Sequence, residues 1–518
     1  MRSAPVVDAM TDSTGGATSP ATPPAAATAF EERERERRRR RVARYDELAA
    51  LRERKAGLRR YYLAQLRRLI GSFVMPDARV LEVGCGFGDL LASLPGSRRV
   101  GVDVSARMVD IARSRHPELD LHVADVEHDE LPAGPYDVIV LSDVVGHLDD
   151  ILVALERLVP LLAPGGRVVV TYYNFAWEPI LRAAETAGLK EPWPEQNWLS
   201  MNDLANILTL ADLEVVRQGT DVLVPVPVPG LSEVANRVGA KVPIVRGGAL
   251  VQYFIARHVP ARLPDALPSV SVICPCRNEK GNIREAVLRT PVMGSGTELI
   301  FVDGSSSDGT VEEIEAVIRE HEAAQRTAPP GAPRLSLSLV HQGDGKGKGD
   351  AVRKGFAAAK NDVLMILDSD LTVPPEDLPK FYRALVAGKG EFINGVRLVY
   401  PMEGEAMRFL NHLGNKFFSL ALSWLLEQPI KDSLCGTKVL YRRAYDRIAQ
   451  NRAFFGEFDP FGDFDLLFGA ARLNMKIVDL PVRYRARTYG DTKISRFAHG
   501  FLLLKMTAFG FKKLRWGG

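Results

Sequence analysis

The sequence predicts an α/β protein with two domains, each built on a sheet of mainly parallel strands. Its 518 residues, 46% of them hydrophobic, are too many for one ordinary core. Short apolar strands alternate with helical patterns twice, first from ARVLEVG to GGRVVVTYY and again from SVSVICPCRNE to DVLMILDSDLTV. Two further apolar segments, LEVVRQG and ALVQYFIARHV, are expected to add an antiparallel edge to the first sheet. The proline-punctuated stretch VPARLPDAL separates the two series, so we expect a linker over residues 260–269.

The N-terminal residues differ from the rest of the chain in composition. Residues 1–30 are rich in Ala, Pro, Thr and Ser, and we expect a disordered tail because they cannot repay the entropy of ordering. Residues 31–72 form a charged helical segment that becomes amphipathic toward its end. Its basic run, Arg37–Arg41, is expected on a solvated helix face rather than on acidic lipid or nucleic acid. The two domains then occupy residues 73–259 and 270–518.

Charge and cysteine content exclude several classes of function. Lys and Arg number 67 and Asp and Glu 64, a formal net charge of +3, so no global field indicates a nucleic-acid partner. The four cysteines form no pair of CxxC units suited to zinc, and free thiols are typical of a reduced compartment. No apolar run reaches the roughly 18 residues of a membrane span, and no hydrophobic secretory segment is present. We expect a cytoplasmic protein that is at most peripheral at the inner face of the membrane.

A glycine-rich turn follows the first predicted strand. It reads EVGCGFG, and alternate glycines let the backbone turn tightly and approach a ligand at the start of the next helix. One carboxylate ends the second strand, where it can accept hydrogen bonds from ribose hydroxyls, and another follows the third, near an adenine amino group. Three strand ends directed at one crevice predict a nucleoside-type cofactor.

This segment resembles the class I S-adenosylmethionine-dependent methyltransferases, which have a Rossmann-like fold. The resemblance rests on LEVGCGFG, VGVDVS, HVADVEHDELP, YDVIVLSDVVGHL and LAPGGRVVV, and its ExGxGxG form differs from the GxGxxG of nicotinamide-binding domains. It implies S-adenosylmethionine as cofactor and a reaction in which positioning supplies much of the catalysis. The residues that the resemblance implies for cofactor binding are Glu82, Gly84, Gly86, Gly88, Asp103 and Asp125. His147 stands where some members keep a general base for hydroxyl acceptors; a histidine that only packs against the cofactor is the alternative.

The second series contains a pair of carboxylates after an apolar strand. Asp368 and Asp370 flank Ser369 directly after VLMIL, and such a pair can bind a hard divalent cation together with diphosphate oxygens. Isolated DxD triplets are common. Here the triplet is accompanied by Lys348 in GKGKGDAVRKGF and by Asp303 at an earlier strand end, and together they predict a nucleotide-diphosphate pocket.

The second half resembles the family 2 glycosyltransferases of GT-A fold, in the branch around dolichyl-phosphate mannose synthase. The motifs are VSVICPCRNEKGNI, ELIFVDGSSSDGT, GKGKGDAVRKGF, LMILDSDLTVPPEDLP, IKDSLCGTKVLYRRA and RTYGDTKIS. The resemblance implies that Asp370, helped by Asp368, holds magnesium or manganese. Gly304 stands where family members often have a second carboxylate, and Arg277 stands where a tyrosine or alanine is commoner. The identity of the donor's nucleobase therefore stays open. The residues implied to contact the nucleotide-sugar are Pro275, Arg277, Glu279, Asp303, Lys348 and Asp368.

Two kinds of sugar acceptor are compatible with the downstream residues. For a hydroxyl acceptor, Asp463 or Asp465 in FGDFDLLFGA is the general base. A polyprenyl phosphate needs no base, and Arg485, Arg487 and Lys493 would then hold the phosphate, following the RxxGx(S/T)K pattern of polyprenyl-phosphate users. A solvated basic loop is the alternative for these three cations. The apolar stretches NKFFSLALSWLLE and HGFLLLKMTAFGFKKLRWGG suit either a membrane interface or burial against the domain.

The main hypothesis is a bifunctional enzyme. One half transfers a sugar with inversion from a nucleotide-diphospho-sugar, and the other transfers a methyl group to a related acceptor. One alternative keeps the glycosyltransferase and makes the N-terminal half a cofactor-binding or regulatory module. Another is a membrane-surface scaffold, which would require both sites to be inactive.

Overall fold

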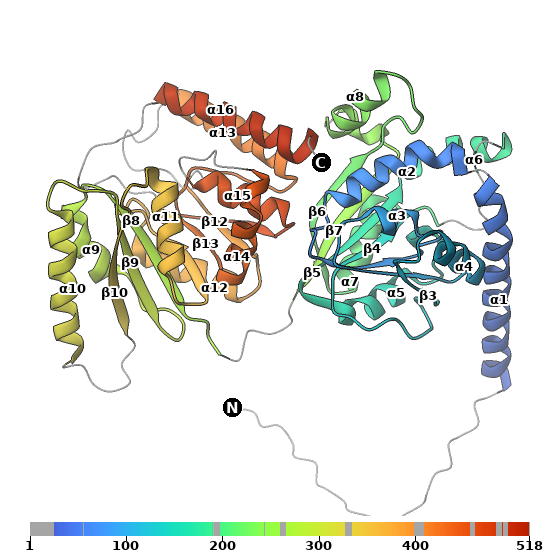
Figure 1. Cartoon of the computed structure of the whole chain (residues 1–518), viewed down its shortest axis with the longest axis horizontal. Helices are drawn as coiled ribbons and strands as arrows, with labels where there is room; N and C mark the ends of the chain where they lie inside the picture. Colours follow the sequence, from blue (N-terminus) through green and yellow to red (C-terminus); the bar gives the residue numbers. More distant parts are fainter. Residues whose placement is uncertain are drawn as a thin grey trace, which may run out of the picture.

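The described part of the chain forms two seven-stranded sheets flanked by helices, which confirms the predicted two-domain α/β fold (Figure 1). A computed structural model describes the ranges 25–54, 56–188, 190, 197–242, 244–259, 266–326, 334–397, 409–455, 462–482, 489 and 496–516. The linker predicted over 260–269 falls partly outside these residues, because its first six positions are not described.

Two helices precede the first sheet. They are α1 (Ala25–Arg54) and α2 (Ala56–Gly71), and Figure 1 shows α1 along the outer side of the first domain and α2 across it. The tail was expected to reach residue 30, but α1 begins within an alanine run, and alanine is the strongest helix former. Residues 1–24 of the expected tail lie outside the described part of the chain.

The basic run Arg37–Arg41 is not simply a solvated face, as the sequence had suggested. Arg38 Nε lies 3.3 Å from Asp125 Oδ2, and Arg41 Nη2 lies 3.6 Å from the same oxygen. A second arm of the Arg41 guanidinium pairs with Asp149 at 2.5 Å. Residues three apart share one face of a helix, so these two arginines point together toward carboxylates of the first domain.

The first sheet has the order β3-β2-β1-β4-β5-β7-β6. Its central strands are parallel, and β7 runs antiparallel to both β5 and β6, which confirms the predicted antiparallel edge. The middle parts of β4 and β5 are continuously buried, with no alternation of buried and exposed residues. This pattern arises because helices cover both faces of a parallel sheet. The strands are β1 (Arg79–Val83), β2 (Arg98–Asp103), β3 (Asp120–Val123), β4 (Tyr136–Ser142), β5 (Leu162–Tyr173), β6 (Leu213–Asp221) and β7 (Val251–His258). The helices are α3 (Asp89–Ser93), α4 (Ala106–Arg115), α5 (Ile151–Leu158), α6 (Glu178–Thr186), α7 (Met201–Leu210) and α8 (Leu231–Arg237).

The second sheet has the order β10-β9-β8-β11-β13-β12-β14. Strands β8 to β11 are parallel, while β13 runs antiparallel to β11 and β12. The strands are β8 (Val270–Cys276), β9 (Thr297–Asp303), β10 (Leu335–His341), β11 (Val363–Ile366), β12 (Phe392–Val396), β13 (Lys438–Tyr441) and β14 (Ile477–Pro481). The helices are α9 (Lys280–Arg289), α10 (Thr310–Arg326), α11 (Gly347–Ala358), α12 (Leu378–Val386), α13 (Phe409–Leu426), α14 (Arg442–Gln450), α15 (Asp463–Arg472) and α16 (Arg496–Phe511).

The two apolar stretches of the second half form α13 and α16, which lie side by side over this domain (Figure 1). The rings of Trp424 and Phe511 stack with centroids 5.6 Å apart. Some apolar side chains of the pair are buried, whereas Phe417, Leu420 and Leu504 are 55%, 65% and 48% exposed. Among the described residues, no helix has the length and apolar character needed to cross a bilayer.

Polar contacts join the two domains. Arg167 on β5 is buried and pairs with Glu391 at 2.6 Å, and Lys476 pairs with Glu214 on β6 at 3.1 Å. The buried Asn474 side chain donates to a backbone carbonyl of the first domain. The antiparallel edge of the first sheet thus contacts the ends of β12 and β14 directly.

Candidate active sites

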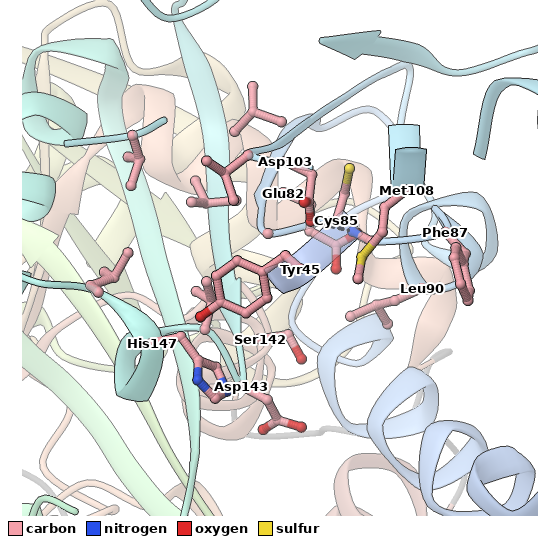
Figure 2. A pocket seen from close by; sticks show the side chains of 18 of the residues that line it. Tyr45, Glu82, Cys85, Phe87, Leu90, Asp103, Met108, Ser142, Asp143 and His147 are labelled. Carbon is pink, nitrogen blue, oxygen red and sulfur yellow. Dashed lines mark hydrogen bonds between the residues drawn. The ribbon is translucent and has the colours of Figure 1, made fainter. Parts of the chain in front are cut away.

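A cavity of about 180 Å³ lies at the carboxyl ends of β1, β2 and β4, beneath α1 and α2. Figure 2 shows side chains from the glycine-rich turn, from β2 and from the segment after β4 gathered around it. The structure brings together the sequence-predicted residues Glu82, Gly84, Gly86, Asp103, Asp125 and His147 in the lining of this cavity.

The glycine-rich turn has the backbone conformation that its sequence requires. Gly84, Gly86 and Gly88 have φ angles of 71°, 53° and 75°, in the left-handed region that favours glycine. A Cβ atom on Gly84 would lie 2.7 Å from a methyl group of Val144, so the segment after β4 packs directly against this turn. Gly88 caps the start of α3 and is absent from the lining of the cavity.

Asp103 holds the turn in place. One oxygen of its carboxylate accepts a hydrogen bond from the Gly86 amide at 2.8 Å, and the other accepts from the Ser105 amide at 2.9 Å. Burial raises the pKa of Asp103, and these two hydrogen bonds oppose that shift. Each carboxylate oxygen has a further lone pair, which a ribose hydroxyl can use.

Glu82 offers an unpaired carboxyl oxygen. The side chain is 2% exposed, and its Oε2 atom has no hydrogen-bond partner within the described part of the chain. Burial, together with the nearby Asp103, raises the pKa of Glu82 well above its ordinary value. A buried polar atom without a partner is costly, so the site fits a ligand that carries a hydrogen-bond donor.

Three residues of α1 line the cavity and were missed by the sequence analysis. Arg41, Tyr45 and Arg52 share one face of the helix, and their spacing was the only signal in the sequence. The Arg52 guanidinium lies 3.7 Å from the Met108 sulfur and 3.7 Å from the position that a Cβ of Gly86 would occupy. Helix α1 therefore closes the cavity with side chains of its own.

Asp143, at the end of β4, was also missed. Its φ angle of 55° is unusual for a residue with a side chain, and such strain is often kept at functional sites. The Tyr62 hydroxyl donates to its carboxylate at 2.6 Å, and the Thr171 hydroxyl donates to the other oxygen at 3.3 Å. His147 lies beside it and meets the Tyr45 ring edge-on, with centroids 6.3 Å apart (Figure 2).

The cavity is acidic. Its described lining contains six carboxylates but only two guanidinium groups, those of Arg41 and Arg52. Such a cleft attracts cations and repels anions. The six carboxylates belong to Glu82, Asp89, Asp103, Asp125, Glu127 and Asp143.

In the second domain, the predicted nucleotide residues begin at the carboxyl ends of β8 and β9. These parallel strands pair in register, so that Pro275 lies opposite Val302 and Asp303 ends β9. Asp303 is buried, and its carboxylate accepts hydrogen bonds from the amides of Ser305 at 3.0 Å and Ser306 at 3.2 Å. The carboxylate thus organises the loop that follows its strand.

Arg277 and Glu279 follow β8 in the same region. The Cβ atom of Arg277 lies 3.4 Å from the position that a Cβ of Gly304 would occupy, which places it against the β9 loop. Glu279 is 5% exposed, and its carboxylate accepts from the Asn282 side chain at 2.8 Å. Glu279 therefore supports the first turn of α9.

The DxD carboxylates follow β11. Lys348 Nζ lies 2.5 Å from Asp368 Oδ1, and the Asp370 carboxylate accepts from the Thr372 amide at 3.1 Å and hydroxyl at 2.8 Å. Desolvation acts to raise the pKa of Asp368, but the Lys348 ammonium, together with Lys438 and Arg397, outweighs it and the pKa is lowered. A Cβ on Gly436 would collide with the Asp368 carboxylate, so glycine is required for this close approach.

Two acidic residues were predicted near the sugar acceptor. Asp465 is 5% exposed, and its carboxylate pairs with Arg452 Nε at 2.8 Å. Asp463 is the first residue of α15, and its side chain lies outside the described part of the chain. The predicted phosphate-binding residues Arg485, Arg487 and Lys493 also lie outside the described residues.

Two family models match the chain, one in each half. The family described as Methyltransferase domain matches residues 35–218, a range that includes part of α1. The family described as Glycosyl transferase family 2 matches residues 271–448.

Similar proteins were found for both halves. A dolichol-phosphate mannosyltransferase from Saccharomyces cerevisiae is 36% identical over 120 residues, which cover 22% of this chain and 40% of that protein. One from Pyrococcus furiosus is 26% identical over 255 residues, covering 48% of this chain and 64% of that protein. The chain thus spans less than two thirds of either relative. A solved methyltransferase from Thermotoga maritima is 17% identical, with a TM-score of 0.34, over 42% of this chain and 98% of that one.

Proposed function

Since the chain carries a methyltransferase domain followed by a family 2 glycosyltransferase domain, we propose that it is one enzyme with two transfer activities. The C-terminal half, residues 270–518, transfers a sugar with inversion from a nucleotide-diphospho-sugar. The N-terminal half, residues 73–259, transfers a methyl group to a related acceptor. The observation that carries this proposal is that each sheet holds its predicted carboxylates at the carboxyl ends of parallel strands.

The residues of the first cavity fit S-adenosylmethionine. When bound, this cofactor supplies a methyl group on a positively charged sulfonium. Asp103 accepts hydrogen bonds from the ribose of the cofactor, and Asp125 accepts one from the adenine amino group. The unpaired oxygen of Glu82 accepts a hydrogen bond from the amino-acid end of the cofactor. The Arg52 guanidinium beside the glycine turn suits the carboxylate of the same end. The acidic lining suits the positive sulfonium.

We assign the methyl acceptor to the class of hydroxyls and amines. An anionic acceptor, such as a phosphate, is repelled by a cavity in which carboxylates predominate. Asp143 and His147 both line the cavity and can receive the acceptor proton, while Tyr62 holds the Asp143 carboxylate in place. Burial, followed by the nearby Asp143, raises the pKa of Tyr62 well above its ordinary value, so this phenol stays a donor.

The proposed role of Asp143 in receiving the acceptor proton predicts that a variant of this residue loses affinity selectively for sinefungin. Sinefungin is a cofactor analogue that carries an amine in place of the sulfonium methyl. Asp143→Asn should weaken sinefungin binding about 10-fold, because one charged hydrogen bond is lost. Its affinity for S-adenosylhomocysteine should stay within about twofold of the wild-type value. Calorimetry measures both. Asp89→Asn, which removes another carboxylate of the same cavity, is the control and should leave the ratio of the two affinities unchanged. Equal losses for both ligands in Asp143→Asn would refute the assignment.

The DxD carboxylates fit a divalent cation, magnesium or manganese. Asp368 and Asp370 offer hard oxygen ligands, and the remaining positions suit diphosphate oxygens. Among the described residues, no group of three His, Cys, Asp or Glu side chains is arranged to hold a metal ion. The metal supplies charge neutralisation for the diphosphate leaving group. Lys348, now paired with Asp368, is placed to turn toward the same diphosphate.

For the sugar acceptor we propose a polyprenyl phosphate. The dolichol-phosphate mannosyltransferase relatives and the exposed apolar residues of α13 and α16 support it, with the protein peripheral at the cytoplasmic face of the membrane. Arg485, Arg487 and Lys493 would hold the phosphate. For a hydroxyl acceptor, Asp463 is the better general base, because the Asp465 carboxylate is buried in an ion pair.

Calorimetric titration of the whole chain tests the proposal. We expect S-adenosylhomocysteine to saturate one site, and one nucleoside diphosphate of a panel to saturate a second site when manganese is present. Binding of the diphosphate alone would reduce the N-terminal half to a structural or regulatory domain. Binding of neither would refute both activities.

A further inference from the structure

A second cavity, of about 350 Å³, lies between the two domains. Its walls come from α2 and β6 of the first domain and from α13, α15 and the C-terminal turn Lys512–Trp516 of the second. Its volume falls within the range of about 300–1,000 Å³ that is typical of small-molecule sites. This cavity is separate from the acidic cavity, although α2 contributes to both.

All charged side chains in the described lining of this cavity are basic. Two of them are neutralised by carboxylates outside the lining. Arg68 pairs with Asp221 at 3.0 Å, and Arg217 pairs with Glu427 at 2.7 Å. The basic lining residues are Arg67, Arg68, Arg217, Arg472 and Lys513.

The other three cations have no carboxylate partner among the residues that the structure describes. The Nε atoms of Arg67 and Arg472 are buried and make no hydrogen bond there. Arg472 uses another nitrogen to donate to the Ser72 carbonyl at 2.7 Å, and its guanidinium lies 4.5 Å from the centre of the Phe454 ring. Lys513 approaches the same ring at 5.4 Å.

This arrangement of cations is costly without a counter-charge. Burial, and secondly the like charge of Arg217, lower the pKa of Arg472. Guanidinium groups taken out of water need an opposite charge to offset their lost hydration. An anion in the cavity provides that charge.

We propose that this interdomain cavity binds a phosphate-bearing anion. Guanidinium groups form paired hydrogen bonds to phosphate oxygens, and a lysine adds a point charge. The apolar walls, which include Phe73, Leu425 and Leu514, leave room for the organic part of a phosphate ester. The ligand is either a soluble phosphate compound or the head group of a phospholipid.

The site is distinct from the sugar-transfer site. Arg472 ends α15, whose first residue is the candidate base Asp463, so one 10-residue helix, about 15 Å long, separates them. On α2, Leu63 and Leu66 line the acidic cavity while Arg67 and Arg68 line this one. A ligand here would contact both domains at once. The inference holds whichever reactions the two domains catalyse.

Pyrophosphate is the probe, titrated into the full chain in the presence of EDTA so that the DxD site cannot bind it through a metal. We expect saturable binding of pyrophosphate. Its affinity should fall about 10-fold or more in Arg67→Ala and in Lys513→Ala, because each variant loses a charged hydrogen bond. Matched controls remove exposed charges from the same segments. Arg60→Ala on α2 and Lys512→Ala beside Lys513 should bind within twofold of the wild-type chain.

Vesicles distinguish the two sources of phosphate. Binding to phosphatidylglycerol vesicles but not to phosphatidylcholine vesicles, lost in Lys513→Ala and kept in Lys512→Ala, identifies a lipid head group. Pyrophosphate binding with no such vesicle effect identifies a soluble ligand. The proposal is wrong if the wild-type chain binds neither probe, or if Lys513→Ala and Lys512→Ala behave alike. Thermal melts of each variant confirm that it is folded.

Discussion

Asp370→Asn should abolish metal-dependent nucleoside diphosphate binding and leave S-adenosylhomocysteine binding unchanged. The substitution keeps the shape of the side chain but removes the charge of a predicted metal ligand. Loss of a residue that only hydrogen-bonds to a metal ligand already lowers metal affinity about 10–100-fold. Because Asp370 is predicted to be a ligand itself, we expect diphosphate affinity to fall more than about 100-fold. Calorimetry with manganese measures it.

A control for Asp370→Asn comes from an exposed carboxylate of the same domain that is not among the predicted metal or nucleotide residues. Glu320→Gln removes a charge from α10, where Glu320 pairs with Arg284 at 2.7 Å, and should leave both affinities unchanged. A joint loss of diphosphate and S-adenosylhomocysteine binding in Asp370→Asn would mean that the two sites are not independent. Unchanged diphosphate binding would remove Asp370 from the metal site.

Asp103→Asn should have the opposite selectivity. The carboxylate is predicted to accept hydrogen bonds from the ribose, and hydrogen bonds to charged groups contribute about 1.5–3 kcal/mol. We therefore expect S-adenosylhomocysteine to bind about 10- to 150-fold more weakly, with manganese-dependent diphosphate binding unchanged.

Two observations separate this effect from unfolding. Asp103 also accepts from the Gly86 and Ser105 amides, so the asparagine variant will lower the melting temperature of the first domain. Adenosine, which keeps the ribose, should lose affinity by the same factor as S-adenosylhomocysteine. If adenosine binding were unaffected while S-adenosylhomocysteine binding fell, Asp103 would act on the amino-acid end of the cofactor.

The sheet edges that hold the candidate sites were predictable because their signals are local. A strand, a glycine turn and a following helix occupy the consecutive residues Arg79–Ser93, and the turn requires positive φ angles that only glycine adopts readily. The same holds for Asp368 and Asp370 after a buried strand. Parallel strands align their carboxyl ends, so each strand-end residue is placed near the others without knowledge of the packing.

One prediction failed because charged side chains meet distant partners. Arg38 and Arg41 were expected in solvent, but they pair with carboxylates more than 80 residues away, including Asp125. The role of Asp465 as a general base stays a prediction; the tertiary structure adds that its carboxylate pairs with Arg452 on the neighbouring segment. Periodicity shows which residues share a helix face; it does not show what that face meets.

The sequence by itself determined the two α/β domains, the glycine turn and the strand-end carboxylates, since each depends on backbone rules that act over a few residues. Only the tertiary structure decided how α1 and α2 close the first cavity, which brings Arg52 to the turn and Tyr62 to Asp143. Only the docking of the domains gathered Arg67, Arg472 and Lys513 around one cavity. These residues lie up to several hundred positions apart, and their contacts follow from the packing of whole elements rather than from any local pattern.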